Sequence, residues 1–513
     1  MSGYLRRLAT TGAAYTAASI FSKLIAVALL PLYTRYLTLA DYGAAEVMFA
    51  AVVSVSIFVR LGLIEALLRF YYKEDEDPGR VLSTTFAALF WFSTAAALLA
   101  LPFAAEISEA LLKDPAPDLA RIAIGGLWVL TLYEYLLTIF RLQERARAFF
   151  VTTMLNVFAA IGLTVVLVVG AGEGARGLLL GSYASGAVFV LGLIAYHWRS
   201  LSLRFDRALL RRLLRFGLPT MPAELSLYAL NFVDRIIIVR SLGLAEAGLY
   251  SLAVKFAQGV NVLVRGFQLA WPPLAYSIRD DGEARRVYAA VVTWFVAAMA
   301  FVVAGMWLLS RWIVRALAAP EFFDAYEPIG LLAAGAALYA LYMVLLVILG
   351  RTGRTEFNFP ATAAALAANV ALNLVLVPPF GIVGAGVALV CSYLVVLALM
   401  YGFTQRLFPV PYQWSRLTRA VLAASALIAA GELLLPPDGA DGLLLRTALW
   451  LAYPLALLAT GFFTPDERRW LTRLRHPGEL ATQLRSLRPA AAGVDGSIPE
   501  AMEAELIDED ARL

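Results

Sequence analysis

Cysteine, histidine and charged side chains are all scarce in this chain of 513 residues. The single cysteine, Cys391, excludes a disulfide framework and a thiolate metal site. The two histidines, His197 and His476, leave little for metal ligation or acid–base chemistry. We therefore expect no metal site and no cofactor.

Only 16% of the residues are charged, whereas soluble proteins carry roughly 25%. Hydrophobic residues make up 61%, and the mean hydropathy is +0.74. No globular core could bury so many apolar side chains, so lipid must be the main solvent of this chain. The formal net charge of +4 lies mostly on loop arginines, which indicates contact with lipid headgroups and not nucleic-acid binding.

Long apolar runs recur along the whole chain, and crossing a hydrocarbon core of ~30 Å needs about 20 residues. We expect an all-α polytopic membrane protein with about fourteen transmembrane helices joined by short connections. The first run follows Arg6 and Arg7 and could be a signal peptide, but its length makes us expect an uncleaved helix. The predicted spans are 12–37, 43–66, 81–104, 119–140, 148–170, 177–198, 217–241, 246–275, 287–310, 326–349, 358–378, 382–404, 417–435 and 443–463.

Basic residues gather in alternate loops, which predicts the orientation of the helices in the membrane. The opposite loops contain Arg176 but no Lys or Arg at 378–381 or 436–441. We expect both termini on the cytoplasmic side of a bacterial inner membrane. The arginines of the cytoplasmic loops are Arg141, Arg145, Arg147, Arg199, Arg204, Arg207, Arg211, Arg212, Arg215, Arg279, Arg285, Arg286, Arg351 and Arg354.

Two basic segments outside the predicted spans are amphipathic. Residues 199–216 and 466–488 place arginines beside leucine or tryptophan, a pattern typical of a helix lying in the headgroup layer. A linker-like stretch at 490–496 follows, and the chain then ends in an acidic tail that we expect to be disordered. The acidic residues of the tail are Glu500, Glu503, Glu505, Asp508, Glu509 and Asp510.

An internal repeat relates the two halves of the chain. Residues 35–43 (RYLTLADYG) align with residues 240–248 (RSLGLAEAG) at an offset of 205, which also places Arg60 over Arg265. Matches at offsets of 206 and 207 continue through six successive spans. Because six is even, the two halves share one orientation and form a parallel repeat.

The repeat divides the chain into two lobes and two further parts. Parallel repeats enclose a site at their interface, and rocking them opens that site alternately to either side. We expect an N-terminal six-helix lobe at 1–206, a C-terminal six-helix lobe at 207–412, helices thirteen and fourteen at 413–464, and a cytoplasmic amphipathic helix with the acidic tail at 465–513.

Ionisable side chains recur inside the predicted spans, where each costs roughly 2.5–3.5 kcal/mol on insertion scales. In the seventh and eighth spans they share a helical stripe with other polar residues, at spacings of three and four. The first and second spans are the repeat equivalents, so we expect these four faces to meet across a central cavity. The candidate substrate-binding residues are Lys23, Arg60, Tyr228, Asn231, Asp234, Arg235, Lys255, Gln258, Asn261 and Arg265.

The stripes contain five basic residues and two acidic ones, Glu224 and Asp234, a net charge of +3. Surplus cations suit an anionic substrate group, and arginine forks onto phosphate oxygens. Other interpretations stay open: Asp234 and Arg235 could form a satisfied packing network, and Arg60 and Arg265 could reach the headgroups.

Two further acids, Glu65 and Glu134, lie inside predicted spans. Each is a candidate site for a coupling ion or a proton. The simpler prediction is an ion pair with a nearby arginine, Arg69 or Arg141 respectively.

Several segments resemble a known family. They are 35–43, Leu214–Pro219 (LRFGLP) with the following Asn231 and Asp234, Gly248–Ala253 (GLYSLA) and Phe380–Gly386 (FGIVGAG). Over residues 5–463 the chain resembles the polysaccharide transporter family of Wzx-like oligosaccharide flippases. This family belongs to the multidrug/oligosaccharidyl-lipid/polysaccharide (MOP) flippase superfamily.

The resemblance implies a V-shaped, two-lobed bundle that works by alternating access. The implied substrate is an undecaprenyl-pyrophosphate-linked oligosaccharide, moved to the periplasmic leaflet for O-antigen, capsule or exopolysaccharide assembly. Expected partners are membrane lipids, a polysaccharide polymerase or other assembly protein, and a coupling ion, either proton or sodium. The pyrophosphate would contact Lys23, Arg60, Lys255 and Arg265, and the sugars would face Tyr228, Gln258 and Asn261.

Three other functions are weighed against this one. A lipid II flippase would share the architecture and a cationic cavity. A multidrug and toxin extrusion transporter would offer acidic or aromatic pockets, and Glu65 and Glu134 keep that alternative open. A membrane glycan polymerase or ligase would need a sizeable outer catalytic segment, whereas the outer loops near 105–118 and 311–325 are short. We therefore do not expect an enzyme.

Overall fold

The computed structural model describes residues 21, 25, 27–72, 77–465 and 467–468. Its regular elements in these ranges are all helices, which confirms the prediction of an all-α protein. The chain forms two compact units, residues 1–453 and 454–513. Lys23, half of the first predicted span, nearly all of the basic segment 466–488 and the acidic tail lie outside the described residues.

In the first half of the chain, helices begin and end at recognisable signals. The Thr38 hydroxyl accepts a hydrogen bond from the Asp41 amide and caps α3, and Leu61 and Gly62 end that helix in the left-handed conformation. The helices are α2 Leu30–Tyr36, α3 Leu39–Arg60, α4 Leu63–Phe70, α5 Pro78–Ala100, α6 Ala104–Leu112, α7 Pro117–Leu142, α8 Ala146–Val165, α9 Gly174–His197 and α10 Arg207–Gly217.

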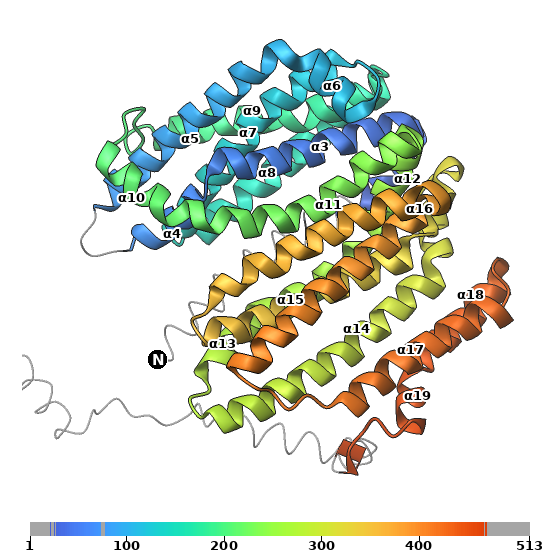
Figure 1. The fold of residues 1–513 in the computed structure, drawn as a ribbon. Helices are drawn as coiled ribbons and strands as arrows, with labels where there is room; N and C mark the ends of the chain where they lie inside the picture. Colours follow the sequence, from blue (N-terminus) through green and yellow to red (C-terminus); the bar gives the residue numbers. More distant parts are fainter. Residues whose placement is uncertain (1–20, 22–24, 26, 73–76, 466, 469–513) are drawn as a thin grey trace, which may run out of the picture. The chain divides into compact units, whose positions relative to one another are not determined.

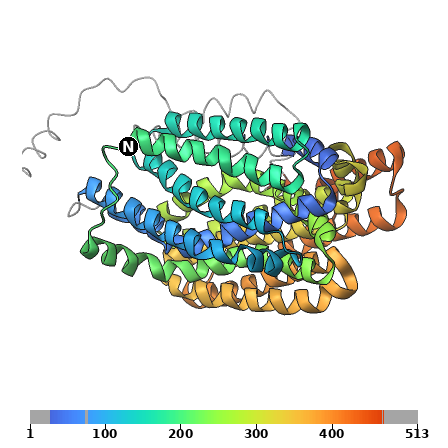
Figure 2. The same ribbon diagram turned by 90° about the horizontal axis from the view of Figure 1, so that it is seen from above.

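The second half continues with longer helices, and those of the larger unit run alongside one another (Figures 1 and 2). They are α11 Met221–Ser241, α12 Leu244–Ala257, α13 Gly259–Ser277, α14 Asp281–Leu317, α15 Ile329–Arg351, α16 Asn358–Leu407, α17 Trp414–Leu434, α18 Gly439–Leu451 and α19 Tyr453–Ala459. A short 3₁₀ helix, η4 Pro320–Tyr326, connects α14 to α15.

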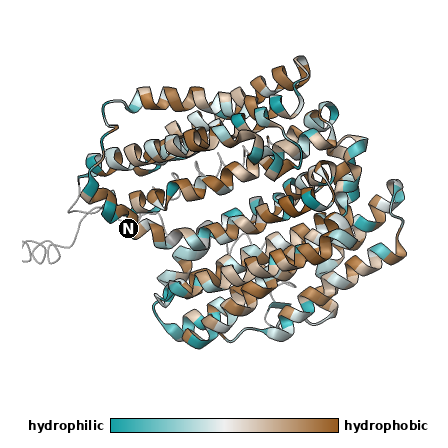
Figure 3. Ribbon diagram, turned by 45° about the horizontal axis from the view of Figure 1, so that its top comes forward, coloured by the Kyte–Doolittle hydropathy of each residue, from teal (hydrophilic) through white to brown (hydrophobic). Residues whose placement is uncertain are grey.

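Lipid-facing surfaces are evident in the larger unit. Large apolar side chains are exposed on several helices, for example Leu99 on α5, Phe158 on α8 and Val188 on α9. Figure 3 shows apolar residues along the lengths of most helices and hydrophilic residues at many helix ends and loops. A soluble protein rarely exposes such large apolar surfaces, so these helices are built to face lipid.

Among the described residues, nine helices are long and apolar enough to span a membrane, or up to eleven when each bent pair is one span. The sequence predicts about fourteen. Half of one missing span, 12–37, lies outside the described residues. Another, α11, carries too many charges to be counted, including Asp234 and Arg235.

The third difference arises in α16, which replaces the predicted spans 358–378 and 382–404. Gly381 interrupts this helix with φ 59° and ψ −145°, and Pro378 and Pro379 precede it. A Cβ built on Gly384 would lie 2.2 Å from the carbonyl oxygen of Leu376. Eight residues of straight helix rise about 12 Å, so the chain folds back here and α16 is two arms.

The two halves of the chain touch closely where α3 and α12 pack together. A Cβ on Gly43 would lie 2.1 Å from the Leu244 carbonyl oxygen, and a Cβ on Gly248 would lie 2.3 Å from the Leu39 carbonyl oxygen. Leu39 and Gly43 are the repeat equivalents of Leu244 and Gly248, at the offset of 205. Such reciprocal contacts are what a twofold axis between two repeats produces.

The basic segment 199–216 forms a helix, α10, as predicted over its second half. Its leucines Leu209, Leu210 and Leu213 are buried in a core cluster with residues of α4 and α5, while Arg211 is exposed. Protein therefore covers the leucine face of α10, and the position of this helix in the headgroup layer stays a prediction.

Candidate functional site

A cavity of about 880 Å³ lies between the two halves of the chain. Residues of α3, α11, α12, α13, α15 and α16 line it, together with Glu65 of α4. Its polar lining consists of Glu46, Ser54, Glu65, Glu224, Tyr228, Arg235, Gln258, Asn261, Arg265, Gln268, Tyr339, Tyr342, Asn358 and Tyr393.

Half of the ten predicted site residues line this cavity: Tyr228, Arg235, Gln258, Asn261 and Arg265. Three of the others lie outside the lining and are engaged in contacts described below: Arg60, Asp234 and Lys255. Of the remaining two, Lys23 is outside the described residues, and the side chain of Asn231 is not among those described.

Lys255 of α12 forms an ion pair with Glu46 of α3, so the pair joins the two halves. Glu46 is almost fully buried, and the Lys255 Nζ also lies 5.1 Å from the centre of the Tyr42 ring. Sequence reasoning missed Glu46, although it is a carboxylate inside a predicted span only three residues from Gly43. Lys255 is thus held by protein, and its partner Glu46 lies about one helical turn beyond Gly43 on α3.

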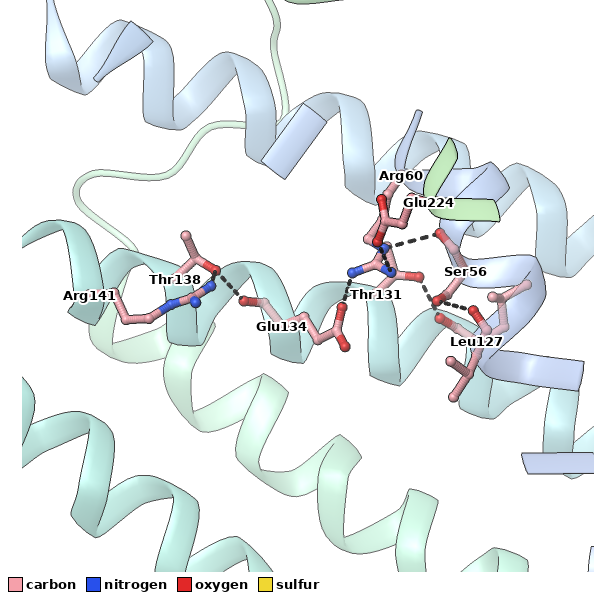
Figure 4. A network of polar contacts seen from close by, with 9 residues as sticks. Ser56, Arg60, Leu127, Thr131, Glu134, Thr138, Arg141 and Glu224 are labelled. Atoms are coloured by element: carbon pink, nitrogen blue, oxygen red, sulfur yellow. Dashed lines mark hydrogen bonds and ion pairs between the residues drawn. The ribbon is translucent and has the colours of Figure 1, made fainter. Parts of the chain in front are cut away.

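Arg60 ends α3 beside two carboxylates from different helices (Figure 4). Its guanidinium pairs with Glu134 of α7, and its Nη2 lies 4.0 Å from the Glu224 Oε1 of α11. Glu134 thus has a partner that the sequence prediction, which named Arg141, did not include. The Arg141 Nη2 donates to the Thr138 hydroxyl at 2.6 Å, as Figure 4 also shows.

Asp234 belongs to a buried polar network within the second half. It accepts hydrogen bonds from the Tyr250 hydroxyl at 2.8 Å and from the Asn373 Nδ2 at 2.7 Å. The neighbouring Arg235 donates from Nε to the Ser251 hydroxyl at 3.1 Å, yet it also lines the cavity. The packing interpretation therefore describes Asp234, while Arg235 serves both roles.

The described lining carries three carboxylates, Glu46, Glu65 and Glu224, and two guanidinium groups, Arg235 and Arg265. Its formal charge is therefore −1, and the predicted surplus of cations is not found in this part of the site. The physical reason is that carboxylates from other helices form ion pairs with Lys255 and Arg60. The spacing of polar residues along one helix cannot show such partners. Arg265 differs from them because no described carboxylate forms an ion pair with it.

Tyrosines and amides form much of the remaining wall. The ring centres of Tyr339 and Tyr342 are 6.1 Å apart, and those of Tyr339 and Tyr393 are 5.8 Å apart. The Tyr342 hydroxyl donates to the Asn358 Oδ1 at 2.7 Å. Sequence reasoning missed these tyrosines because aromatic residues in apolar spans usually belong to the core. Tyrosine rings can pack against the faces of sugar rings, and the side-chain amides of the lining can hydrogen-bond sugar hydroxyls.

Comparison with known proteins shows the family of this chain. The family described as "Polysaccharide biosynthesis protein" matches residues 32–327, more than half of the chain. The chain belongs to this family. The succinoglycan biosynthesis transport protein ExoT of Rhizobium meliloti (strain 1021) is 27% identical over 319 residues, 59% of this chain. That match spans 61% of the relative's own length.

Solved structures show the same fold. The lipid II flippase MurJ in an inward closed conformation has a TM-score of 0.66 at 14% identity, covering 87% of this chain and 97% of MurJ. An inward-facing MATE multidrug resistance transporter of the MOP superfamily has a TM-score of 0.63 at 16% identity, covering 76% of this chain and 95% of that one. The predicted family is confirmed, and the chain shares the fold of these two transporters.

Proposed function

We propose that this protein is a flippase for an undecaprenyl-pyrophosphate-linked oligosaccharide. It carries the glycan from the cytoplasmic to the periplasmic leaflet by alternating access, for surface polysaccharide assembly. The observation that carries the proposal is the cavity between the halves, where tyrosines and amides accompany Arg265 in a chain of the polysaccharide biosynthesis family. The name of the relative ExoT, a succinoglycan biosynthesis transport protein, supports a saccharide substrate.

Within this proposal Arg265 is the first anchor for the pyrophosphate, because no carboxylate partner competes for it among the described residues. Arg235 and Lys23 are the next candidates. Arg60 and Lys255 bind phosphate only by leaving Glu134 and Glu46. The sugars face Tyr228, Gln258, Asn261, Tyr339, Tyr342 and Asn358.

We infer alternating access from two polar contacts of α3, one near the start of the helix and one at its end. The Glu46–Lys255 pair is formed next to the contact of Gly43 and Gly248, so this end is closed. At the other end of α3, the Arg60–Glu224 contact is at 4.0 Å and is weak. We propose that the first pair breaks and the second tightens when the cavity opens to the opposite side.

The membrane topology is also part of the proposal. Counting α11 as a span, α16 as two and the first predicted helix as one brings the eleven spans to about fourteen. The lobes are 1–206 and 207–412, followed by helices thirteen and fourteen at 413–464 and the cytoplasmic segment 465–513. From the arginine-rich loops we infer that both termini lie in the bacterial cytoplasm, and in that orientation the closed end at Gly43 faces the periplasm.

A coupling ion, proton or sodium, remains part of the proposal, and so does docking on a polysaccharide polymerase or another assembly protein. The buried Asp234 is the best placed carboxylate for such an ion. The neighbouring Asn373 Oδ1 is buried and has no hydrogen-bond partner among the described residues. A carboxylate and an amide oxygen are ligands for a hard cation, and the carboxylate alone serves a proton.

The test is deletion of the gene in its native host, followed by analysis of lipid-linked glycans on each membrane leaflet. We expect an undecaprenyl-linked oligosaccharide to accumulate on the cytoplasmic side. When the deletion strain is complemented, the export rate with Arg265→Gln should be at least tenfold lower than with wild type. The control is Arg121→Gln, whose arginine pairs with Asp118 at an exposed site and should restore export fully. Unchanged glycans in the deletion strain would contradict the proposal.

Two alternatives stay distinguishable in the same strain. Multidrug extrusion is favoured by one observation, the excess of one carboxylate over the guanidinium groups in the described lining. It predicts unchanged glycans and increased sensitivity to cationic dyes. A lipid II flippase predicts accumulation of the peptidoglycan precursor in place of the surface-polysaccharide intermediate.

A further inference from the structure

We propose a second binding site, a saccharide pocket outside the transport cavity. A pocket of about 370 Å³ lies where α14, α15, α16 and α17 meet. It is lined by two aromatic residues, three charged residues and a serine: Trp307, Tyr326, Arg311, Glu327, Glu432 and Ser310. None of these six residues lines the cavity described above.

The pocket lies at the closed end of the two halves. Tyr326 ends η4, and η4 packs against the start of α3 through an edge contact of Phe322 and Tyr42 at 5.7 Å. The Ala319 amide just before η4 also donates to the Thr34 hydroxyl of α2 at 3.0 Å. The cavity lining on α3 begins beyond this point, at Glu46. The contact of Gly43 and Gly248 therefore separates the two sites along α3.

Helices outside the repeat complete the pocket wall and fix it in place. Glu432 of α17 pairs with Arg446 of α18 at 2.8 Å, and Arg446 is fully buried. The Trp450 Nε1 of α18 donates to the Phe301 carbonyl of α14 at 2.9 Å. Because α17 and α18 are bound to α14 in this way, the Glu432 carboxylate has a defined place beside Trp307.

The aromatic side of the pocket is also built by close packing. A Cβ on Gly330 would lie 2.4 Å from the Trp307 ring, so only glycine lets the indole lie where it does. The Arg311 guanidinium lies 4.5 Å from the centre of the Tyr326 ring. The ring of Trp307 and the polar ends of Arg311 and Glu327 therefore line one pocket.

The charges favour a neutral ligand. The lining carries one guanidinium group, Arg311, and two carboxylates, Glu327 and Glu432, and Glu432 is paired with Arg446 behind it. The pocket therefore has no surplus of positive charge to attract a free phosphate. Planar carboxylate and guanidinium groups bind pairs of hydroxyls, and aromatic faces bind the apolar faces of sugar rings. A saccharide offers both surfaces, which identifies the ligand class.

Three residues of this pocket have no similar residues at the equivalent positions of the first half. At the offset of 206, the positions equivalent to Trp307, Arg311 and Tyr326 are Leu101, Ala105 and Ala120. The repeat alone therefore does not produce the pocket. Its aromatic and charged residues occur only in the half that α17 and α18 cover.

The identity of the physiological ligand depends on the proposed function. In that topology the closed end faces the periplasm, so the pocket meets glycans on the receiving side of the membrane. Two sources share the saccharide chemistry: the sugar part of the transported lipid-linked molecule and the finished surface polysaccharide. The experiment below separates them.

The experiment measures binding by calorimetry to the purified full-length protein in nanodiscs. The soluble probe is the oligosaccharide repeat released by hydrolysis of the host's own surface polysaccharide. We expect wild type to bind it with a millimolar or lower Kd, and Glu327→Gln to bind at least fivefold more weakly. Glu327 is exposed, so this variant should fold, and Trp307→Leu provides a second test. Binding by both variants equal to wild type would overturn the proposal.

A second arm uses the native lipid-linked oligosaccharide in the Arg265→Gln background, which weakens cavity binding. Binding that requires the lipid-linked form and is lost in Glu327→Gln identifies the transported molecule as the ligand. Binding of the soluble probe identifies the polysaccharide. If wild type binds neither the soluble probe nor the lipid-linked oligosaccharide, the pocket assignment is wrong. Normal flipping by Arg265→Gln would refute the cavity assignment instead, so the two failures are distinguishable.

Discussion

Gly43 of α3 and Gly248 of α12 face each other across the boundary between the two halves. Each occupies a position where an added Cβ would meet the backbone carbonyl of the residue four positions before the other glycine. This approach lets the two helices touch through their backbones. In the proposed mechanism this contact closes one end of the cavity, and Glu46 lies three residues beyond Gly43, paired with Lys255.

Gly43→Val should prevent this closure. The new Cβ would lie 2.1 Å from the Leu244 carbonyl, so the two helices must separate. Overpacking typically costs about 1–3 kcal/mol, enough to favour the conformation in which this end is open. Accessibility of a cysteine placed at Ser251 to a membrane-impermeant reagent, in a Cys391→Ser background, should rise on the periplasmic side.

The matched control is Gly192→Ala in α9, where a Cβ would meet nothing within 4 Å. Its reagent accessibility and its transport should equal those of the parent. An unchanged accessibility in Gly43→Val, with the protein inserted normally, would show that the crossing is not the closed gate.

Lys255→Met should destabilise the protein, because it leaves the buried Glu46 carboxylate without its cation. Removing one partner of a buried pair costs about 3–5 kcal/mol, and we expect about 3 because Lys255 is 30% exposed. The double variant with Glu46→Gln should recover much of that loss. Thermal unfolding in detergent measures all three proteins. A double variant no more stable than Lys255→Met would contradict the pairing.

Gly381→Ala should weaken the turn between the two arms of α16. Its φ of 59° with ψ −145° is a conformation that L residues rarely adopt, and forcing one into it costs about 1–3 kcal/mol. Gly402→Ala in the same helix has a free Cβ position and ordinary helical geometry, so it should be neutral or stabilising. Equal melting temperatures for the two variants would refute the strained turn.

The start of α10 should respond to acid. Hydrogen bonds from Arg80 and from the Leu209 and Ala208 amides lower the pKa of Asp206 to about 2. A carboxyl with a lowered pKa stabilises the fold fully above its ordinary value of about 4 and loses that contribution as the pH falls towards 2. Amide hydrogen exchange in α10 should therefore differ between wild type and Asp206→Ala at pH 6 and converge near pH 2. A constant difference would argue against this linkage.

Sequence alone predicts the helices whose apolar runs are long and uniform. The predicted span 119–140 became α7, Pro117–Leu142, and 177–198 became α9, Gly174–His197. The break between the predicted spans 358–378 and 382–404 falls where Gly381 reverses the chain, although hydropathy cannot show the backbone conformation of that glycine. The repeat alignment paired Gly43 with Gly248 as equivalents, yet it could not show that equivalent residues touch.

The candidate site was harder to predict than the fold. Helical stripes identified Arg235 and Arg265, because polar residues at spacings of three and four share a face. They could not show that Glu46 holds Lys255, since 209 residues separate the two. Tyr339 was missed because its surroundings in sequence are apolar. The charge of the cavity is thus a tertiary property, set by partners from other helices.

The most direct test of the central claim is flipping by the purified protein in proteoliposomes. The lipid-linked oligosaccharide extracted from the deletion strain is incorporated, and an impermeant glycosidase reports the fraction in the outer leaflet. We predict that wild type equilibrates the leaflets and that Arg265→Gln slows this at least tenfold, while Arg121→Gln does not. Equal leaflet exchange with and without the protein would contradict the account.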